Sequence, residues 1–127
     1  MGIRLYLRRL ITVEGNPFVI NRRKYRRMPI IHTCEISCEL SSKSYEGKMV
    51  NISANGFAFS SREADISKTK GMKVTLQVPG FDVLKGEALV GHVIRISDNE
   101  GEYIVGCRML DDNMNIYEYV EKNYKGY

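Results

Sequence analysis

The stretch Ile30-Ile31-His32-Thr33-Cys34-Glu35-Ile36-Ser37-Cys38-Glu39-Leu40 decides the fold class, because its side chains alternate between two kinds. The even positions are mainly apolar, whereas the odd positions from Thr33 to Glu39 are polar. Successive side chains of a β-strand point to opposite faces, so a period of two is typical of a strand with one face buried and the other in water. The stretch therefore predicts a half-buried strand.

Five further segments with the same alternation follow along the chain. They are expected at residues 45–52, 57–61, 72–78, 83–96 and 103–109, with turns at Ser41 to Ser44, Asn55-Gly56, Pro79-Gly80 and Asp98 to Gly101. Asn-Gly is a common choice at corners with positive φ, and we expect such a corner at Asn55-Gly56. Six short strands with tight connections predict an antiparallel barrel, because closure leaves no strand edge exposed.

The C-terminal segment has a different period. Ile116, Val120 and Tyr124 recur every four residues, which predicts a helix with one face packed on the barrel, and Asp111 or Asp112 is a candidate for its N-cap. The predicted fold class is thus mainly β, a six-stranded antiparallel β-barrel with a C-terminal α-helix.

Composition and charge narrow the function classes. The chain has 127 residues and a net charge of +4, and residues 1–27 hold eight Lys or Arg against one acidic residue. This uneven charge favours a local anion site over a long track for nucleic-acid phosphates. Three cysteines without paired spacing indicate a cytoplasmic protein, and no apolar run is long enough to span a membrane.

Two alternative uses of the His and Cys side chains have little support in the sequence. His32, Cys34 and Cys38 share the inward face of one predicted strand, and no Cys-x-x-Cys pair is present to hold zinc, so we expect no metal site. His92 falls in the alternating row of residues 83–96 and is expected to be a core histidine. Because no nucleophile motif or phosphate-loop lysine accompanies these residues, we expect a protein that is not an enzyme.

The cluster Arg22-Arg23-Lys24-Tyr25-Arg26-Arg27 points to an anionic ligand. Four guanidinium groups in six positions repel one another and stay charged at physiological pH, so they need water or a bridging anion. The planar fork of arginine donates two parallel hydrogen bonds to phosphate oxygens, and the same fork matches the O6 and N7 acceptors of guanine.

A second motif, Asn51-Ile52-Ser53-Ala54-Asn55-Gly56, supplies short hydrogen-bonding side chains and a glycine that permits close backbone approach. The pair R-x-x-x-R and N-x-S-x-x-G resembles the PilZ family, which binds the bacterial second messenger cyclic di-GMP. The resemblance covers residues 21–124 and implies a six-stranded barrel with a closing helix. The ligand-binding residues it implies are Arg22, Arg23, Arg27, Asn51, Ser53, Gly56 and Arg95.

The resemblance also assigns finer roles. An arginine directly before the first motif, here Arg22, implies capture of an intercalated dimer of cyclic di-GMP. Arg95 occupies a position where some relatives contact the ligand, although an ordinary outward-facing strand residue is an equally good interpretation. Ligand binding is expected to order residues 22–27, the arginine segment, against the barrel and so to signal to a partner or fused domain. The resemblance implies a glycosyltransferase or a flagellar component as that partner.

The sequence leaves two alternative functions, and it does not determine the role of residues 1–20. The rivals are a small barrel that binds single-stranded nucleic acid through the basic arm, and a PilZ domain that has lost its ligand and serves only for protein interaction. Residues 1–20 fit an interdomain linker, a partner-docking segment or a piece of a larger protein, and their hydrophobic pattern does not distinguish a helix from a strand.

Overall fold

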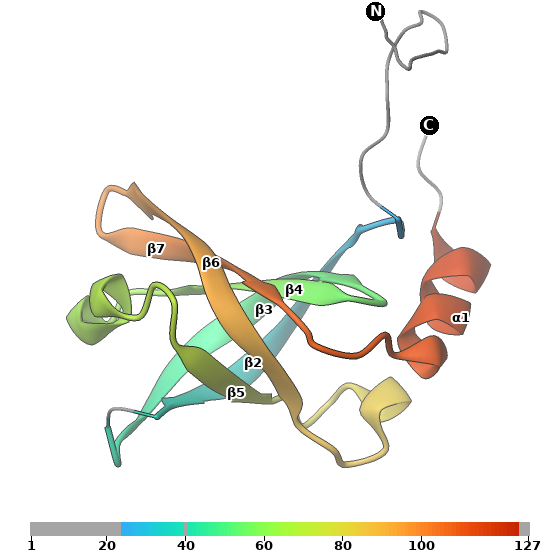
Figure 1. The fold of residues 1–127 in the computed structure, drawn as a ribbon, viewed down its shortest axis with the longest axis horizontal. Helices are drawn as coiled ribbons and strands as arrows, with labels where there is room; N and C mark the ends of the chain where they lie inside the picture. The colour runs from blue at the N-terminus through green and yellow to red at the C-terminus, as the bar shows by residue number, and fades with distance from the viewer. Residues whose placement is uncertain (1–23, 40, 125–127) are drawn as a thin grey trace, which may run out of the picture.

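A computed structural model describes residues 24–39 and 41–124, and within these ranges six strands close into an antiparallel barrel (Figure 1). The strands are β2 (Met28–Cys38), β3 (Ser44–Ser53), β4 (Gly56–Ser61), β5 (Lys73–Gln77), β6 (Leu89–Asn99) and β7 (Glu102–Arg108). They are ordered β2-β3-β4-β7-β6-β5 around the ring, and β5 pairs again with β2. The predicted fold class is confirmed, and the predicted arm at residues 1–20 lies outside the described residues.

Apolar side chains from every strand fill the barrel interior. In β2 the even positions point inward as predicted, and Cys34 and Ile36 are buried. Met49 and Phe59 of the next two strands are fully buried beside them. Residues of this size that leave water completely each stabilise a fold by roughly 1.5–3 kcal/mol, so the alternation in the sequence is also the main source of stability.

Two β-bulges change which side chains face the core. In β3 one extra residue between Met49 and Asn51 shifts the register with β4, so that Met49 and Ile52 are both buried. In β6 one extra residue between Val93 and Arg95 shifts the register with β7 in the same way. The bulges therefore turn Asn51 and Arg95 outward, although a regular continuation of either strand would point them inward.

Residues 83–96 differ from the prediction of a single strand. Residues Asp82–Leu84 form a short 3-10 helix, η3, and β6 begins only at Leu89. The inward positions of β6 before the bulge are odd-numbered, so Val90 and Ile94 are exposed. His92 is correspondingly half-buried on the outward face, where its register partners are Lys73 and Arg108, and is not a core histidine.

The turn between β3 and β4 also differs from its prediction. The chain reverses at Ala54-Asn55. Gly56 is the first residue of β4, and its φ is not positive. A hairpin turn with positive φ does occur between β6 and β7, at Glu100 and Gly101, where the φ values are 54° and 88°. These two residues match the mirror-image turn that suits the twist of a hairpin.

Helix α1 (Met114–Asn123) packs against the barrel through Ile116 and Val120, as predicted. Its N-cap is Asn113, whose side-chain Oδ1 accepts a hydrogen bond from the Ile116 N–H at 3.0 Å, and not Asp111 or Asp112. Among the described residues, no helix has the length and apolar character needed to cross a membrane. A second short 3-10 helix, η2 (Ala64–Lys68), connects β4 to β5.

Candidate ligand-binding site

A cleft of about 350 Å³ opens on the outer face of the barrel, where β3, β4, β7 and β6 lie side by side (Figure 1). Its floor follows one row of register partners, which runs Asn51, Ala58, Gly106, Arg95 across the four strands. The middle of the row has the two smallest side chains and its ends have polar ones. Because the centre of the row fills so little space, the sheet surface is hollow there.

The motif 51–56 forms one end of the cleft and is held together by Ser53. The Ser53 hydroxyl, only 2% exposed, lies within hydrogen-bonding distance of the Asn55 side-chain oxygen (3.1 Å) and the Gly56 carbonyl (3.3 Å). Its oxygen also accepts a hydrogen bond from the Asn55 N–H at 3.4 Å. The serine therefore fixes the turn that places Asn51 and Asn55 at the cleft wall.

Gly56 lies where two strands approach too closely for a side chain. A Cβ atom at this position would stand 2.8 Å from the backbone carbonyl oxygen of Cys107, its neighbour across β4 and β7. The glycine is required for this contact, as the sequence suggested, while the expected positive φ plays no part.

Residues 24–27 form a second wall and belong to the arginine cluster. Lys24, Tyr25 and Arg27 line the cleft, whereas Arg26 lies beside α1. Arg26 Nε is 3.8 Å from Glu121 Oε2, and its guanidinium lies 5.2 Å from the centre of the Tyr124 ring. The Tyr25 ring meets Tyr117 edge to face, with 5.7 Å between centroids. This segment thus contacts the cleft and the helix at the same time.

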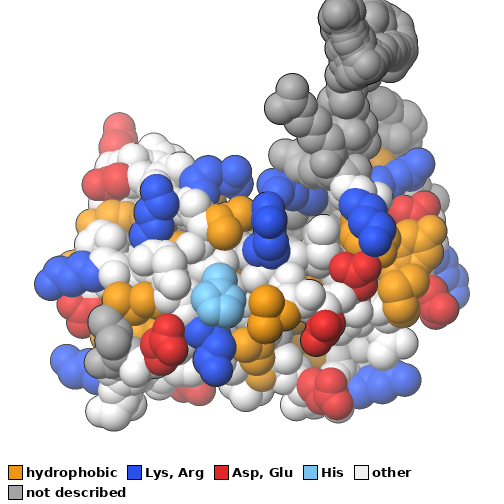
Figure 2. All heavy atoms as spheres, in the orientation of Figure 1, with side chains coloured by type: hydrophobic (Ala, Val, Ile, Leu, Met, Phe, Trp, Pro, Cys, Tyr) orange, Lys and Arg blue, Asp and Glu red, His pale blue; other side chains and the backbone are white. Residues whose placement is uncertain are grey.

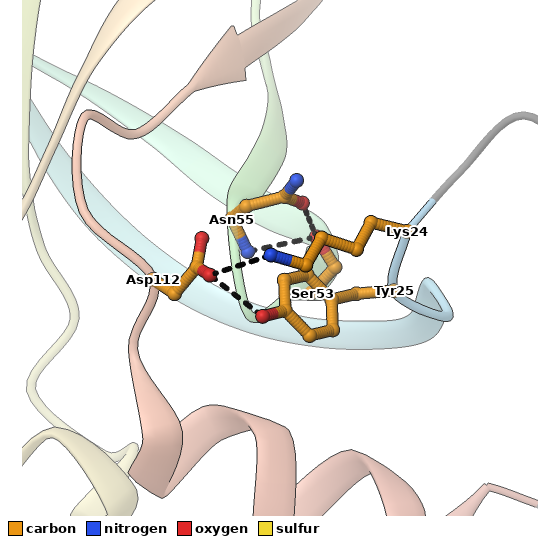
Figure 3. A network of polar contacts seen from close by, with 5 residues as sticks. All are labelled: Lys24, Tyr25, Ser53, Asn55 and Asp112. Carbon is orange, nitrogen blue, oxygen red and sulfur yellow. Dashed lines mark hydrogen bonds and ion pairs between the residues drawn. The ribbon is translucent and has the colours of Figure 1, made fainter.

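Asp112, in the loop between β7 and α1, fixes the position of this wall (Figure 3). Its Oδ2 accepts a hydrogen bond from the Tyr25 hydroxyl at 2.6 Å and lies 3.5 Å from Lys24 Nζ. The hydrogen bond from Tyr25, helped by the charge of Lys24, lowers the pKa of Asp112, and the same hydrogen bond raises the pKa of Tyr25. At neutral pH, Asp112 is therefore a carboxylate and Tyr25 a phenol that donates to it.

Positive charge dominates the cleft. Lys24, Arg27, Arg95 and Arg108 all line it, and Asp112 is the single carboxylate among its described residues. The Arg95 guanidinium lies over Gly106, since a Cβ atom built there would be 3.2 Å from Arg95 Nη2. Lys and Arg side chains gather on this face between the β6–β7 hairpin and α1 (Figure 2). Such a cluster around a small-residue floor suits an anion with a flat ring system.

The structure brings together all the predicted site residues that it describes. Arg27, Asn51, Ser53, Gly56 and Arg95 line one cleft, although they come from three separate parts of the chain. Arg22 and Arg23 lie outside the described residues. The sequence analysis missed Arg108 and Asp112. Arg108 could have been found, because inward-facing Cys107 and Met109 leave it on the outer face beside Gly56.

Of the three cysteines, Cys107 borders the cleft, whereas Cys34 and Cys38 do not. Burial raises the pKa of Cys34 to about 11 and that of Cys107 to about 12, so both stay protonated at neutral pH. Within residues 24–39 and 41–124, no three His, Cys, Asp or Glu side chains gather closely enough to hold a metal ion.

Several known structures resemble this chain. A PilZ domain with c-di-GMP of YcgR from Escherichia coli aligns with a TM-score of 0.59 and 17% identity, covering 84% of this chain and 100% of that one. An inhibitor of motility from Bacillus subtilis, MotI/DgrA, aligns with a TM-score of 0.58 and 15% identity over 81% of this chain. The MrkH–c-di-GMP complex of K. pneumonia aligns with a TM-score of 0.57 and 16% identity over 82% of this chain.

These structural similarities establish the fold, and a family model matches the sequence as well. The chain spans about half the length of the MotI and MrkH chains, which are covered to 51% and 50%. No curated protein matches the chain. The model of the PilZ domain matches residues 21–122, which include both motifs and all six strands. The chain therefore belongs to the PilZ domain family.

Proposed function

We propose that this protein is a receptor for cyclic di-GMP and that it binds the ligand in the cleft between the arginine segment and β3, β4, β7 and β6. The observation that carries the proposal is the meeting of Arg27 with Asn51, Ser53 and Gly56 in one cleft. Two structural neighbours with the same fold are complexes with c-di-GMP. The cleft volume of about 350 Å³ lies within the range of small-molecule sites, roughly 300–1,000 Å³.

Each side of the cleft has a role in this proposal. Arg23 and Arg27 bind phosphate oxygens and the O6 and N7 edge of guanine through paired hydrogen bonds. Asn51 and Ser53 face the opposite side of the ligand. Arg95, at the end of the floor row, and Arg108, beside Gly56, cover an exposed guanine ring, because a guanidinium stacks favourably on an aromatic face.

Arg22 extends the proposal to two ligand molecules. Its guanidinium directly precedes the R-x-x-x-R motif, and the family resemblance implies that such an arginine holds a second cyclic di-GMP stacked on the first. We therefore propose an intercalated dimer as the bound species.

The output of binding passes through the arginine segment. The ligand neutralises Arg23 and Arg27 and pins the segment against the barrel, while Tyr25 and Arg26 connect it to α1. The surface changed in this way acts on a partner or fused domain, and a motility component is favoured by the neighbour described as an inhibitor of motility. We propose a cytoplasmic protein with a binding and not a catalytic role.

Isothermal titration of the full chain with cyclic di-GMP tests the proposal. We expect saturable binding near two ligands per protomer, no binding of GTP or of a short single-stranded oligonucleotide, and a loss of affinity of at least about ten-fold in Arg27→Ala, since charge-assisted hydrogen bonds are worth about 1.5–3 kcal/mol each. Arg62→Ala is the matched control, because Arg62 pairs with Glu102 and does not line the cleft. Equal affinity of both variants would refute the site, and salt-dependent binding of the oligonucleotide alone would favour the nucleic-acid rival.

A further inference from the structure

Asp112 stands in the cleft with a charge opposite to that of its surroundings. It is the residue before Asn113, the N-cap of α1, and its side chain is 38% exposed. Its Oδ2 takes two donors from the arginine segment, the Tyr25 hydroxyl at 2.6 Å and Lys24 Nζ at 3.5 Å, and Figure 3 shows both side chains pointing at the carboxylate. The site proposed for an anionic ligand therefore contains an anion of its own.

The backbone fixes where this anion stands. The Met109 N–H donates to the Asn55 carbonyl at 2.9 Å, and the Asn113 N–H donates to the Ala54 carbonyl at 2.7 Å. The loop that holds Asp112 is thus tied at both ends to the turn of the 51–56 motif. These bonds hold the backbone on both sides of Asp112 beside the cleft, whereas the Lys24 side chain is 71% exposed and can reorient.

The donors that bind Asp112 are also those that an anionic ligand needs. An ammonium and a phenol hydroxyl donate to phosphate oxygens as readily as to a carboxylate. A phosphate that approaches Lys24 and Tyr25 meets the Asp112 carboxylate at contact distance, and two like charges that close repel each other. One anion therefore has to give up these donors.

Building on the proposed function, we propose that Asp112 is an internal competitor for the ligand phosphate, which holds Lys24 and Tyr25 until cyclic di-GMP takes them over. In this way Asp112 lowers the affinity of the receptor for cyclic di-GMP. Because Asp112 adjoins the cap of α1, the exchange of partners also reaches the start of the helix.

The test is a titration of the full chain with cyclic di-GMP in two variants that remove the same charge. Asp112→Asn keeps an oxygen that can accept from Tyr25 but removes the anion, and we expect it to bind the ligand about two- to five-fold more tightly, the size expected for one exposed ion pair. Asp111→Asn is the matched control, because the neighbouring carboxylate does not line the cleft. We expect its affinity to equal that of the unmodified protein.

A double-mutant cycle with Lys24→Gln separates competition from a general charge effect. If Asp112 acts by holding Lys24, the gain from Asp112→Asn shrinks once Lys24 is absent. An unchanged or weaker affinity of Asp112→Asn, an equal gain in Asp111→Asn, or a full gain in the Lys24→Gln background would each overturn the inference alone. Absence of binding in the unmodified protein and in every variant would overturn the proposed function, and this inference with it.

Discussion

Ala58 on β4 and Gly106 on β7 are register partners at the centre of the cleft floor, and both lie on the outer face of the barrel. Their inward-facing neighbours, among them Phe57, Phe59 and Val105, are buried in the core. At the centre of the floor, β4 and β7 therefore present large side chains to the interior and almost none to the cleft. The hollow results from two missing side chains and not from a gap between strands.

A larger residue at Ala58 fills this hollow. We expect Ala58→Leu to weaken cyclic di-GMP binding by about ten-fold or more, since overpacking costs about 1–3 kcal/mol, while the exposed side of the sheet tolerates the change and the melting temperature stays nearly constant. Ser97→Leu, on an exposed part of β6 outside the cleft, is the control. Titration and thermal unfolding measure the two effects, and undiminished binding in Ala58→Leu would place the ligand elsewhere.

Any side chain at Gly56 pushes β4 away from β7. We expect Gly56→Ala to lower the free energy of unfolding by about 1–3 kcal/mol and to weaken binding, because its Cβ atom would stand 2.8 Å from the Cys107 carbonyl oxygen. Gly80→Ala is the matched control, as its Cβ atom would meet only His32 Nδ1 at an ordinary 3.5 Å. Urea unfolding of both variants checks this, and equal stabilities would show that the strands separate at little cost.

Arg22 is expected to control stoichiometry more than affinity. In the proposed dimer, Arg22→Ala removes the guanidinium that holds the second ligand, so titration should give a value that moves from two ligands per protomer towards one. Arg9→Ala removes the same charge outside the motif and should leave the value at two. A stoichiometry of two in both variants would show that Arg22 is not needed to bind the second ligand.

The three thiols should differ in reactivity. Cys34 and Cys107 are buried, so iodoacetamide does not reach them. Their pKa values are raised to about 11 and about 12, so both are protonated thiols at pH 8 and react slowly. Cys38 is only partly buried. We expect mass spectrometry to show one rapid alkylation, at Cys38, and three once the protein is unfolded in urea. Rapid labelling of Cys107 in the folded protein would mean that β7 opens readily.

Much of the barrel was predictable because its signals are local. The alternation of β2 identified Cys34 and Ile36 as inward residues, and the spacing of Ile116 and Val120 identified the face that α1 buries. Each signal depends on the side chains of a single element. The alternation of apolar and polar side chains within a strand does not depend on which strands pair with it, so it can be recognised from one segment alone.

The misses have physical causes that lie between elements. A single strand was expected from residue 83 onward, but η3 and the turn after it interrupt the chain there, and η3 contacts α1. Next to η3, Phe81 meets Tyr119 of α1 edge to face at 5.3 Å. The N-cap of α1 is Asn113, and the Asp112 carboxylate instead accepts a hydrogen bond from Tyr25, which lies 87 residues away in the sequence. A single segment does not reveal such long-range partners.

The site was predicted in outline and not in composition. Arg27, Asn51, Ser53 and Gly56 were named from motifs and Arg95 from its position in the predicted strand, and all five line one cleft. How they are arranged in the cleft depends on strand register. Arg108 enters the cleft because β7 pairs with β4 and β6 at once. Asp112 had an apparent role as a helix cap, which concealed its place in the cleft.

The bulge in β3 joins two halves of the strand whose alternations are out of step. Met49 and Ile52 face the core across an interval of three residues, because Val50 is the extra residue of the bulge. Without the bulge, the same sequence would turn Asn51 to the core and Ile52 to the cleft. Loss of the single codon for Val50 removes this mismatch instead, so a gene can shorten β3 by one residue and still keep Asn51 on the cleft face.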